Sequence, residues 1–240
     1  MNYETYDNNR STRIIDLINS NESINYSKFK EIKYDNKLPR PLNYNFLDIN
    51  SIWEINADKY PEISDVILNI QKWDMATNSS SVGAANYAVL YYLLINKFKN
   101  IKYKKVFDEI EMVELITSTK KYLLKHFDST NVELGRFQKL VRGNKEIGIF
   151  GLPDVITAMK GIKYKDGKIK ITHGESYISL VKFKDEKVEI ETIMSYGSSD
   201  NPNSKHYNDQ MDLYSKFKTK KMSLDKDEVY KKGVKVYNPK

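Results

Sequence analysis

The sequence has no cysteine among its 240 residues. Disulfide bonds, thiolate nucleophiles and zinc sites with cysteine ligands are therefore excluded. The three histidines, His126, His173 and His206, lie too far apart along the chain to form a local histidine metal motif. No stretch approaches the roughly 18 consecutive apolar residues that a membrane-spanning helix needs. The sequence thus predicts no metal site and no interaction with a membrane.

Short catalytic and nucleotide-binding motifs are also missing. The sequence contains no G-x-S-x-G, H-E-x-x-H, G-x-x-x-x-G-K-[ST] or G-x-G-x-x-G pattern. No cofactor is therefore expected. The first ten residues are polar and lack an apolar segment, so they predict no secretory signal peptide.

The composition is that of an ordered globular protein, with 40% hydrophobic and 30% charged residues. The net charge of +7 comes from 39 basic and 32 acidic residues, with lysine-rich runs at 97–105 and 216–221. Such runs suit either a solvated surface or an anionic partner. Acidic residues interrupt almost every basic stretch, and no nucleic-acid motif accompanies them. A solvated surface is the favoured interpretation, and no nucleic-acid partner is expected.

Apolar residues recur at helical spacing through the first half of the chain. Ser11 or Thr12 is a candidate cap for the first of these segments, and prolines in 38–42 break the helical pattern. One segment, 81–98, is apolar on nearly every side and is expected to lie in the middle of a larger structure. The predicted helices span 10–20, 25–36, 60–74, 81–98 and 108–127.

The second half of the chain favours strands. Apolar residues alternate on both sides of Asp166-Gly167, which predicts a hairpin, and 176–197 predicts two further strands. A helix at about 208–218 and a strand at 233–239 are expected to follow. The sequence therefore predicts an α+β fold: a helical N-terminal half, then antiparallel strands and a C-terminal helix. We expect a mainly helical region at 1–142 and a sheet region at 143–240, folded together.

The segment 172–177 places the side-chain types of a hydrolytic triad within four residues: His173, Glu175 and Ser176. Neighbouring side chains on a strand point to opposite faces, so Glu175 and Ser176 cannot both converge on His173. The favoured interpretation is the start of a strand whose polar groups are satisfied locally.

The same segment, HGESYISLVKF, followed by YGSSDNPNSKHYNDQMDLY, resembles the C-terminal signature of the penicillin acylase family. Within that family it is most similar to the acyl-homoserine-lactone acylases. Three upstream stretches resemble family motifs in the same order, so the likeness extends over essentially the whole chain. These stretches are 8–36 (N-R-x-x-R and K-x-D), 68–92 (W-D and S-x-G-A) and 134–155 (R-G and G-x-P-D).

The sequence departs from the family pattern at several positions. Glu175 replaces the usual Asp, and Lys205 replaces the proline before His206. Leu134 and Arg136 stand where the family has Trp and Asp. These departures concern local geometry rather than membership.

The resemblance implies an N-terminal nucleophile hydrolase with an αββα core. In such enzymes the N-terminal serine of the large subunit attacks an amide with its own α-amino group as base, helped by an oxyanion hole. The family's serine, oxyanion-hole groups and assisting arginine lie upstream of the matched region. Asn2 follows Met1, so loss of Met1 would not expose a nucleophile. The resemblance therefore transfers no catalytic residue to this chain.

The family-motif positions near the C-terminus are expected to be structural or to support the active site indirectly. We expect 196–209 to be a buried loop, stiffened by proline, that supports a sheet edge, with its polar side chains bonded to backbone groups. The positions concerned are His173, Gly174, Glu175, Ser176, Tyr177, Gly197, Pro202, Ser204, His206, Tyr207, Asp209 and Gln210.

Three functions fit the sequence. The first is the C-terminal segment of an acylase, active on N-acyl amides only with an upstream polypeptide that carries the nucleophile. The second is an inactive truncated fragment, and the third is a basic module that binds anions. The resemblance implies a periplasmic or extracellular location for full-length members, while the compartment of this chain stays open.

Overall fold

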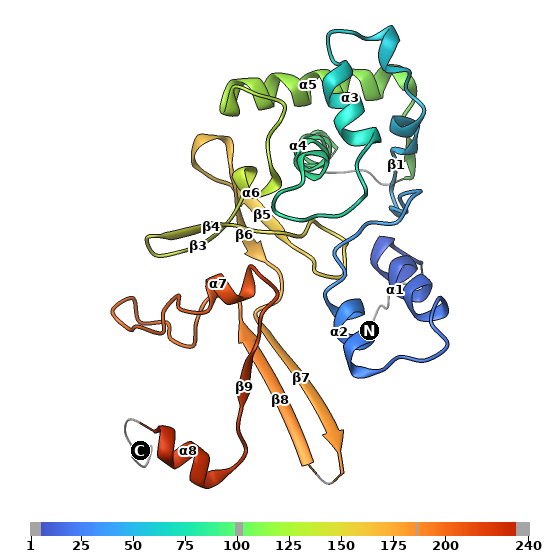
Figure 1. Ribbon diagram of the computed structural model, residues 1–240. Coiled ribbons are helices and arrows are strands. Elements are labelled where there is room, and N and C mark those ends of the chain that lie inside the picture. The colour runs from blue at the N-terminus through green and yellow to red at the C-terminus, as the bar shows by residue number, and fades with distance from the viewer. Residues whose placement is uncertain (1–5, 99–102, 186, 234–240) are drawn as a thin grey trace. The chain divides into compact units, whose positions relative to one another are not determined.

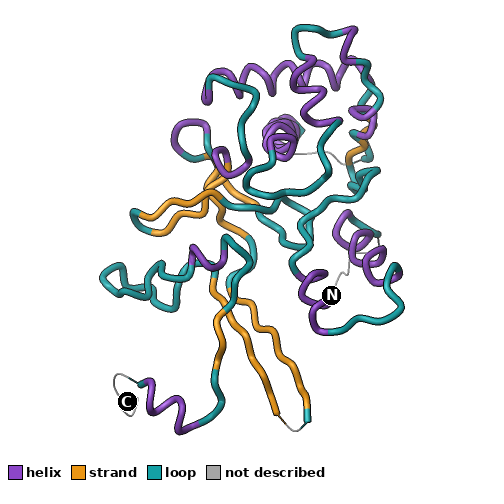
Figure 2. Tube along the Cα trace, viewed as in Figure 1, coloured by secondary structure: helices purple, strands orange, loops and turns teal. Residues whose placement is uncertain are grey.

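The computed structural model describes residues 6–98, 103–185 and 187–233 (Figure 1). The chain divides into two compact units, Met1–Gly174 and Glu175–Lys240. Helices dominate up to residue 137 and strands dominate after it, as Figure 2 shows. The predicted α+β class is confirmed. The predicted boundary between 142 and 143 lies in the turn between two strands, Gln138–Arg142 and Lys145–Gly148, and stays a prediction as a domain boundary.

The first unit contains six α-helices and six strands among its described residues. The α-helices are α1 (Asn9–Asn19), α2 (Tyr26–Lys33), α3 (Ser64–Gln71), α4 (Val82–Lys97), α5 (Glu109–Phe127) and α6 (Leu134–Phe137). The strands are β1 (Leu47–Asp48), β2 (Lys105–Val106), β3 (Gln138–Arg142), β4 (Lys145–Gly148), β5 (Lys160–Lys163) and β6 (Ile169–His173). Short 3-10 helices occupy Asn50–Trp53, Ala57–Lys59 and Lys165–Gly167.

The helix predicted at 10–20 is α1, which begins at Asn9, before both of the predicted caps. Asn8 is the cap: its side chain accepts a hydrogen bond from the Ser11 backbone N–H, and the Ser11 hydroxyl accepts one from the Asn8 N–H. Ser11 is thus the third residue of a capping box and not the cap itself. The prediction of Ser11 or Thr12 as cap was wrong because an asparagine with extended backbone precedes them.

The core of the first unit is built around α4, which packs against α3, α5 and α6 (Figure 1). Ten residues of α4 are buried, as the apolar pattern of 81–98 predicts. Ser81 caps this helix by accepting a hydrogen bond from the Ala84 N–H at 3.1 Å. The apolar stripe of 60–74 is buried against the same core, through Ile63, Val66, Ile67, Ile70 and Trp73.

A four-stranded sheet with the order β4-β3-β6-β5 completes the first unit. The hairpin predicted at Asp166-Gly167 joins β5 to β6, and both turn residues have positive φ, as a tight hairpin turn requires. The sheet is mixed, because β3 and β6 pair in parallel. The other pairs of this sheet are antiparallel, as the sequence predicts. The parallel pairing of β3 with β6, which β4 and β5 separate along the chain, is a feature that the sequence did not predict.

The second unit is a three-stranded antiparallel sheet with the order β7-β8-β9 and two short helices. Its elements are β7 (Tyr177–Lys184), β8 (Lys187–Met194), α7 (Met211–Tyr214), β9 (Lys220–Met222) and α8 (Lys226–Lys232). The β7 and β8 strands are those predicted within 176–197. The helix expected at 208–218 is shorter, α7 alone, and the chain from Ser215 leads directly into β9. The strand expected at 233–239 lies outside the described residues, except for Gly233.

Alternation along β7 gives this sheet two different faces. Ile178 and Leu180 are buried on one face, together with Ile193 of β8. The opposite face carries exposed apolar side chains together with the polar Ser179, Lys220 and the buried Thr192. Its apolar side chains include a cross-strand row from Val181 through Ile190 to Met222.

We call this surface the open sheet face. Its apolar residues are Tyr177, Val181, Phe183, Val188, Ile190 and Met222.

Candidate functional site

The predicted triad types at 173–176 do not form a catalytic set. His173 ends β6 in the first unit, and its Nδ1 lies 2.9 Å from Oγ1 of Thr172. Glu175 and Ser176 belong to the second unit, where their carbonyls accept hydrogen bonds from the Ser195 hydroxyl. The Ser195 backbone N–H also donates to the Ser176 carbonyl, at 3.1 Å. These bonds join the start of β7 to the end of β8, in agreement with the structural interpretation of this motif.

Gln210 connects the long loop between β8 and α7 to the sheet. Its Oε1 accepts a hydrogen bond from the Met194 N–H at 3.0 Å, and its own N–H donates to the Tyr196 carbonyl at 2.9 Å. Gln210 is almost completely buried. The Gln210 side chain thus accepts the hydrogen bond that a backbone carbonyl of a neighbouring strand would otherwise accept from Met194. The sequence analysis expects such a bond between a loop side chain and the backbone.

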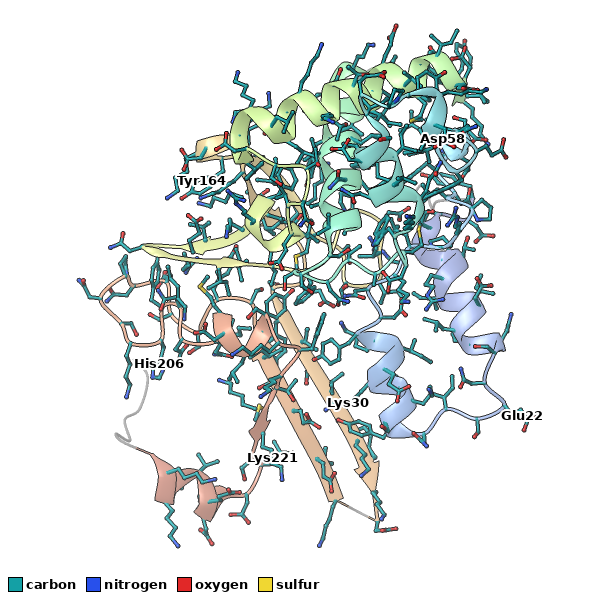
Figure 3. The ribbon with its side chains drawn as sticks, turned by 45° about the horizontal axis from the view of Figure 1, so that its top comes forward. Glu22, Lys30, Asp58, Tyr164, His206 and Lys221 are labelled. Atoms are coloured by element: carbon teal, nitrogen blue, oxygen red, sulfur yellow. The ribbon has the colours of Figure 1, made fainter. Side chains whose placement is uncertain are left out.

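His206 and Asp209 behave differently from the expectation. Their side chains bond to each other, with Nδ1 of His206 2.8 Å from Oδ2 of Asp209, and not to the backbone. Both side chains are exposed, and His206 lies on the loop before α7 (Figure 3). The two groups are three positions apart in a turn, a spacing that favours pairing of the side chains over bonds to a more distant backbone.

The loop itself is largely exposed in this chain, where the sequence predicts a buried one. Pro202 lies on its exposed part, and Ser204 accepts a hydrogen bond from the His206 N–H. Only its base is crowded: a side chain at Gly197 would meet the His206 carbonyl at 2.1 Å and approach Tyr207. The loop geometry therefore depends on glycine at 197, while the role of these residues in any activity stays a prediction.

The first motif of the N-terminal region takes part in a hydrogen-bond network within the first unit. We call the network formed by Asn9, Asn43 and Asp154 the Asn9 tie. Asn9 is completely buried, and its backbone N–H and Nδ2 both donate to Oδ2 of Asp154, at 3.0 and 2.9 Å. Its Oδ1 accepts a hydrogen bond from the Asn43 N–H at 2.6 Å. Arg10 donates from Nε to the Val155 carbonyl. Three segments far apart in the sequence are thus fixed by one asparagine.

A second tie joins α1 to the end of α2. Arg13 and Asp35 form a two-pronged ion pair, with Nε and Nη2 donating to the two carboxylate oxygens at 3.0 and 2.7 Å. The hydrogen bond to Asp35 raises the pKa of Arg13 above its usual value. The Asp35 carboxylate also accepts from the Lys37 N–H. The N-R-x-x-R and K-x-D motifs therefore hold the first two helices to each other.

Asp154 lies near the buried Tyr87 and the partly buried Tyr44 and Tyr91. Burial raises its pKa above the usual aspartate value, against the opposing effect of the hydrogen bonds from Asn9. Burial likewise raises the pKa of Tyr91 to about 12. The hydroxyls of Tyr44 and Tyr87 lie 2.7 Å apart, and burial raises both of their pKa values. At neutral pH these phenols are un-ionised hydrogen-bonding groups.

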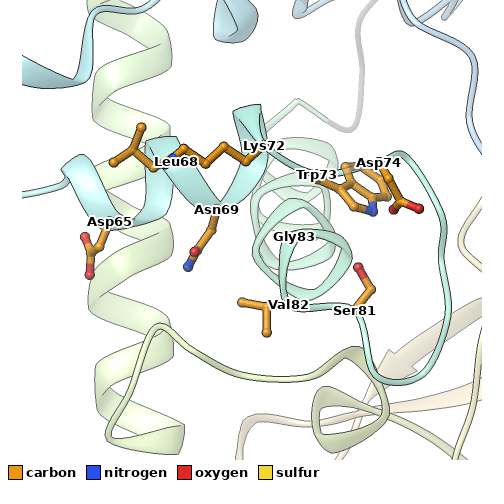
Figure 4. A pocket seen from close by; sticks show the side chains of 9 residues that line it. All are labelled: Asp65, Leu68, Asn69, Lys72, Trp73, Asp74, Ser81, Val82 and Gly83. Atoms are coloured by element: carbon orange, nitrogen blue, oxygen red, sulfur yellow. The ribbon is translucent and has the colours of Figure 1, made fainter.

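A wide hollow of about 520 Å³ lies beside the residues that match the family's W-D and S-x-G-A motifs (Figure 4). Trp73 and Gly83 lie in close contact there. A Cβ atom added at Gly83 would lie only 2.4 Å from Cβ of Trp73, so the packing requires glycine at this position. The indole Nε1 donates to the Ala76 carbonyl at 2.7 Å. On the far side, Asp65 accepts hydrogen bonds from Lys120 and Thr130, which help to lower its pKa. The indole N–H of Trp73 and the carboxylate of Asp65, which both line the hollow, are thus engaged in hydrogen bonds within the fold.

Gln138 is a buried polar residue that the sequence analysis missed. Its Nε2 faces three successive carbonyls, those of Ile149, Phe150 and Gly151, with the shortest distance 2.8 Å. It thereby fixes the loop that leads to Asp154. A single glutamine at the start of a strand gives no sequence signal that distinguishes it from an exposed one.

The part of the chain that the structure describes holds no cluster of potential metal ligands. No group of three or more His, Asp or Glu side chains in this part is placed to hold a metal ion. In the same ranges, the ring of His126 packs on Tyr122, and the rings of His173 and His206 bond to a threonine and an aspartate. A separate observation is that no helix in the described parts combines the length and apolar character needed to cross a bilayer.

Comparison with known families decides the affiliation of the chain. The model of the family described as Penicillin amidase matches residues 1–231. The chain belongs to the penicillin amidase family. The resemblance noted in the sequence is therefore confirmed.

Several known acylases are similar to this chain. The acyl-homoserine lactone acylase PvdQ of Pseudomonas syringae pv. syringae is 35% identical over 75 residues, 30% of this chain and 10% of that protein. PvdQ of Pseudomonas syringae pv. tomato is 28% identical over 117 residues, 45% of this chain and 15% of that protein. The aligned segments thus span a small part of these relatives. A thermostable penicillin G acylase from Alcaligenes faecalis has a TM-score of 0.43 at 11% identity, covering 99% of this chain and 54% of that chain.

Proposed function

We propose that this chain is one component of a penicillin amidase-type hydrolase that cleaves N-acyl amides, with the N-terminal nucleophile on polypeptide outside these 240 residues. Family membership and the acylase names of the relatives support the reaction class. In that reaction a hydroxyl attacks the amide carbonyl, the amine leaves with a proton, and water releases the acid from the acyl ester. The family resemblance transfers no catalytic residue to this chain, so the proposal assigns the nucleophile and its base to the other component.

The observation that carries the proposal is the open sheet face of the second unit. Phe183 is 79% exposed and Tyr177 is 54% exposed, on strands whose other face buries Ile178, Leu180 and Ile193. A contiguous apolar surface of this kind marks an interaction site. An antiparallel sheet of three strands normally needs only one solvated face, and that face is normally polar. A second layer of protein packed on the open sheet face accounts for its composition.

The free edge of this sheet points to the same conclusion. In the described chain β7 has a partner on one side only, because the strand order is β7-β8-β9. It is eight residues long and so leaves a long row of backbone donors and acceptors at the edge. A strand from the other component can pair there and continue the sheet.

Capture of the partner from the chain's own host cell tests this proposal. We expect the tagged chain to copurify with a polypeptide whose first residue is Ser, Thr or Cys. The complex should release free acid from N-hexanoyl-homoserine lactone or from a phenylacetyl amide. Release of acid by the pure chain alone contradicts the proposal, as does a captured complex without an N-terminal nucleophile.

A matched pair of variants locates the contact. Phe183→Asp places a charge on the open sheet face, and Tyr103→Asp changes a comparably exposed aromatic residue of the first unit, at 83% exposure. We expect Phe183→Asp to abolish copurification and Tyr103→Asp to leave it unchanged, with circular dichroism confirming that both variants fold. Equal effects of the two variants would exclude the open sheet face as the docking surface.

A further inference from the structure

A second cavity, of about 420 Å³, lies within the first unit between α4, α5, α6 and the edge strand β5. Its floor is apolar and includes Val89, Phe137 and Ile169, all of them buried. The rings of Tyr92 and Tyr122 form part of the wall. The size and the mostly apolar lining are those of small-molecule sites in proteins.

The local backbone keeps this cavity open. The pairing of β5 with β6 shifts register between Lys160 and Gly161, a bulge that re-aims the side chains of an edge strand. Gly161 lies directly on β6, where a side chain would meet Ile169 Cγ2 at 2.4 Å. Its N–H donates to the Tyr92 hydroxyl at 3.0 Å. All four residues of β5 consequently line the cavity.

The charged groups of the cavity wall are of one sign. Lys160 and Lys163 line it and are exposed, and no acidic residue lines it. Neither lysine forms an ion pair with any residue that the structure describes, although lysines elsewhere in this unit, such as Lys105 and Lys168, do. Asn96 adds an exposed amide at the rim. The wall therefore combines an apolar floor with two uncompensated positive charges.

We propose that this cavity binds a small carboxylate with an unbranched apolar chain, the chain against the floor and the carboxylate beside Lys160 and Lys163. Charge-assisted bonds from lysine to a carboxylate are among the stronger polar contacts in proteins. The volume equals the share of roughly 14 liquid waters, at about 30 Å³ each, enough for a chain of about eight carbons. Octanoate is a suitable probe. For a ligand of about ten non-hydrogen atoms we expect a Kd on the order of 0.1–1 mM.

Titration of the full 240-residue chain with three eight-carbon probes tests the head group. The probes are octanoate, 1-octanol and octylammonium, followed by amide chemical shifts in heteronuclear NMR. We expect octanoate to shift the amides of Leu93, Gly161 and Ile169 and to bind about tenfold more tightly than octanol, with octylammonium weakest. Equal affinities for octanoate and octanol would overturn the proposal. Octanoate shifts confined to the open sheet face would overturn it as well.

Two double variants test the lysines. Lys160→Glu with Lys163→Glu reverses both charges of the cavity wall, and Lys220→Glu with Lys221→Glu makes the same change on exposed lysines of β9. We expect the first pair to weaken octanoate binding at least tenfold while octanol binding stays constant, and the second pair to have no effect. A similar loss in both double variants would show general charge attraction and contradict the site. This binding is independent of the proposed acylase role, since it is measured without any partner polypeptide.

Discussion

The two units of this chain differ in how completely each satisfies its own apolar surface. In the first unit the central helix α4 is buried by its neighbours, and the charged and polar motif residues form closed ties such as Asn9–Asp154. In the second unit the sheet buries Ile178, Leu180 and Ile193 on one face and leaves apolar side chains exposed on the other. The first unit has a buried core of its own. The proposed function interprets the exposed apolar side chains of the second unit as a surface that another polypeptide covers.

The largest expected effect lies in the core of the first unit. Trp73→Ala removes an indole that packs against Gly83 and Tyr87 and donates to the Ala76 carbonyl. Burial of this side chain is nearly complete, so we expect a loss of about 3–5 kcal/mol in the free energy of unfolding. Urea unfolding followed by circular dichroism measures it.

The other tryptophan provides the control. Trp53 is only partly buried, stacks with the Arg40 guanidinium and donates to Asn50. Trp53→Ala is expected to cost about 1 kcal/mol. Equal losses from the two variants would show that the first unit lacks the self-sufficient core described above.

The second largest effect tests the two faces of the sheet in the second unit. Leu180 is buried and Val181, its neighbour on β7, is exposed on the open sheet face. We expect Leu180→Ala to cost about 2–3 kcal/mol and Val181→Ala less than about 0.5 kcal/mol in the same urea experiment. A cost at Val181 comparable to that at Leu180 would mean that the open sheet face is covered in the isolated chain, for instance by self-association.

Most of the first unit could be predicted from its sequence because its elements follow local rules. The helical stripe ending at Trp73, the apolar segment 81–98 and the hairpin at Asp166-Gly167 each depend on residues close together in the chain. Periodicity and turn chemistry are sufficient for such elements.

The features that the sequence did not predict are set by tertiary contacts. The parallel pairing of β3 with β6 depends on how two hairpins meet, and β9 is a lysine-rich segment that becomes a strand only because β8 offers it an edge. Asn9 and Asp154 lie within two of the stretches that resemble family motifs, yet the sequence gives no sign that they touch, since they are 145 positions apart. Composition likewise gives no signal for the β5 cavity, which depends on a bulge and a close glycine contact.

A smaller effect is expected at the Asn9 tie. Asn9→Ala removes the side chain that donates to Asp154 and accepts from the Asn43 N–H, so it leaves a part-buried donor and a part-buried acceptor each without one partner. The expected loss in the free energy of unfolding is about 1–3 kcal/mol. Asn25→Ala is the matched control, because Asn25 caps α2 at an exposed position and should cost about 1 kcal/mol. A loss at Asn9 no larger than at Asn25 would contradict the role of the tie in joining distant segments.

The smallest effect is a pH dependence from the same tie. Burial raises the pKa of Asp154 in the folded chain, so the folded state binds a proton at pH values where the unfolded aspartate, with a pKa of about 3.9, has lost it. The unfolded state therefore binds fewer protons in this window, and stability falls as pH rises from the unfolded pKa through the raised folded one.

Asp154→Asn retains an oxygen acceptor for Asn9 and has no charge to lose. The difference in unfolding free energy between the native chain and Asp154→Asn should decline from about pH 3.5 upward and then level off. Asp65 and Glu146 have lowered pKa values and contribute with the opposite sign, but they are common to both proteins and cancel in the difference. A difference that rises with pH would mean that Asp154 is stabilised as the anion, and that the tie of the first unit works as an ion site beside Arg10.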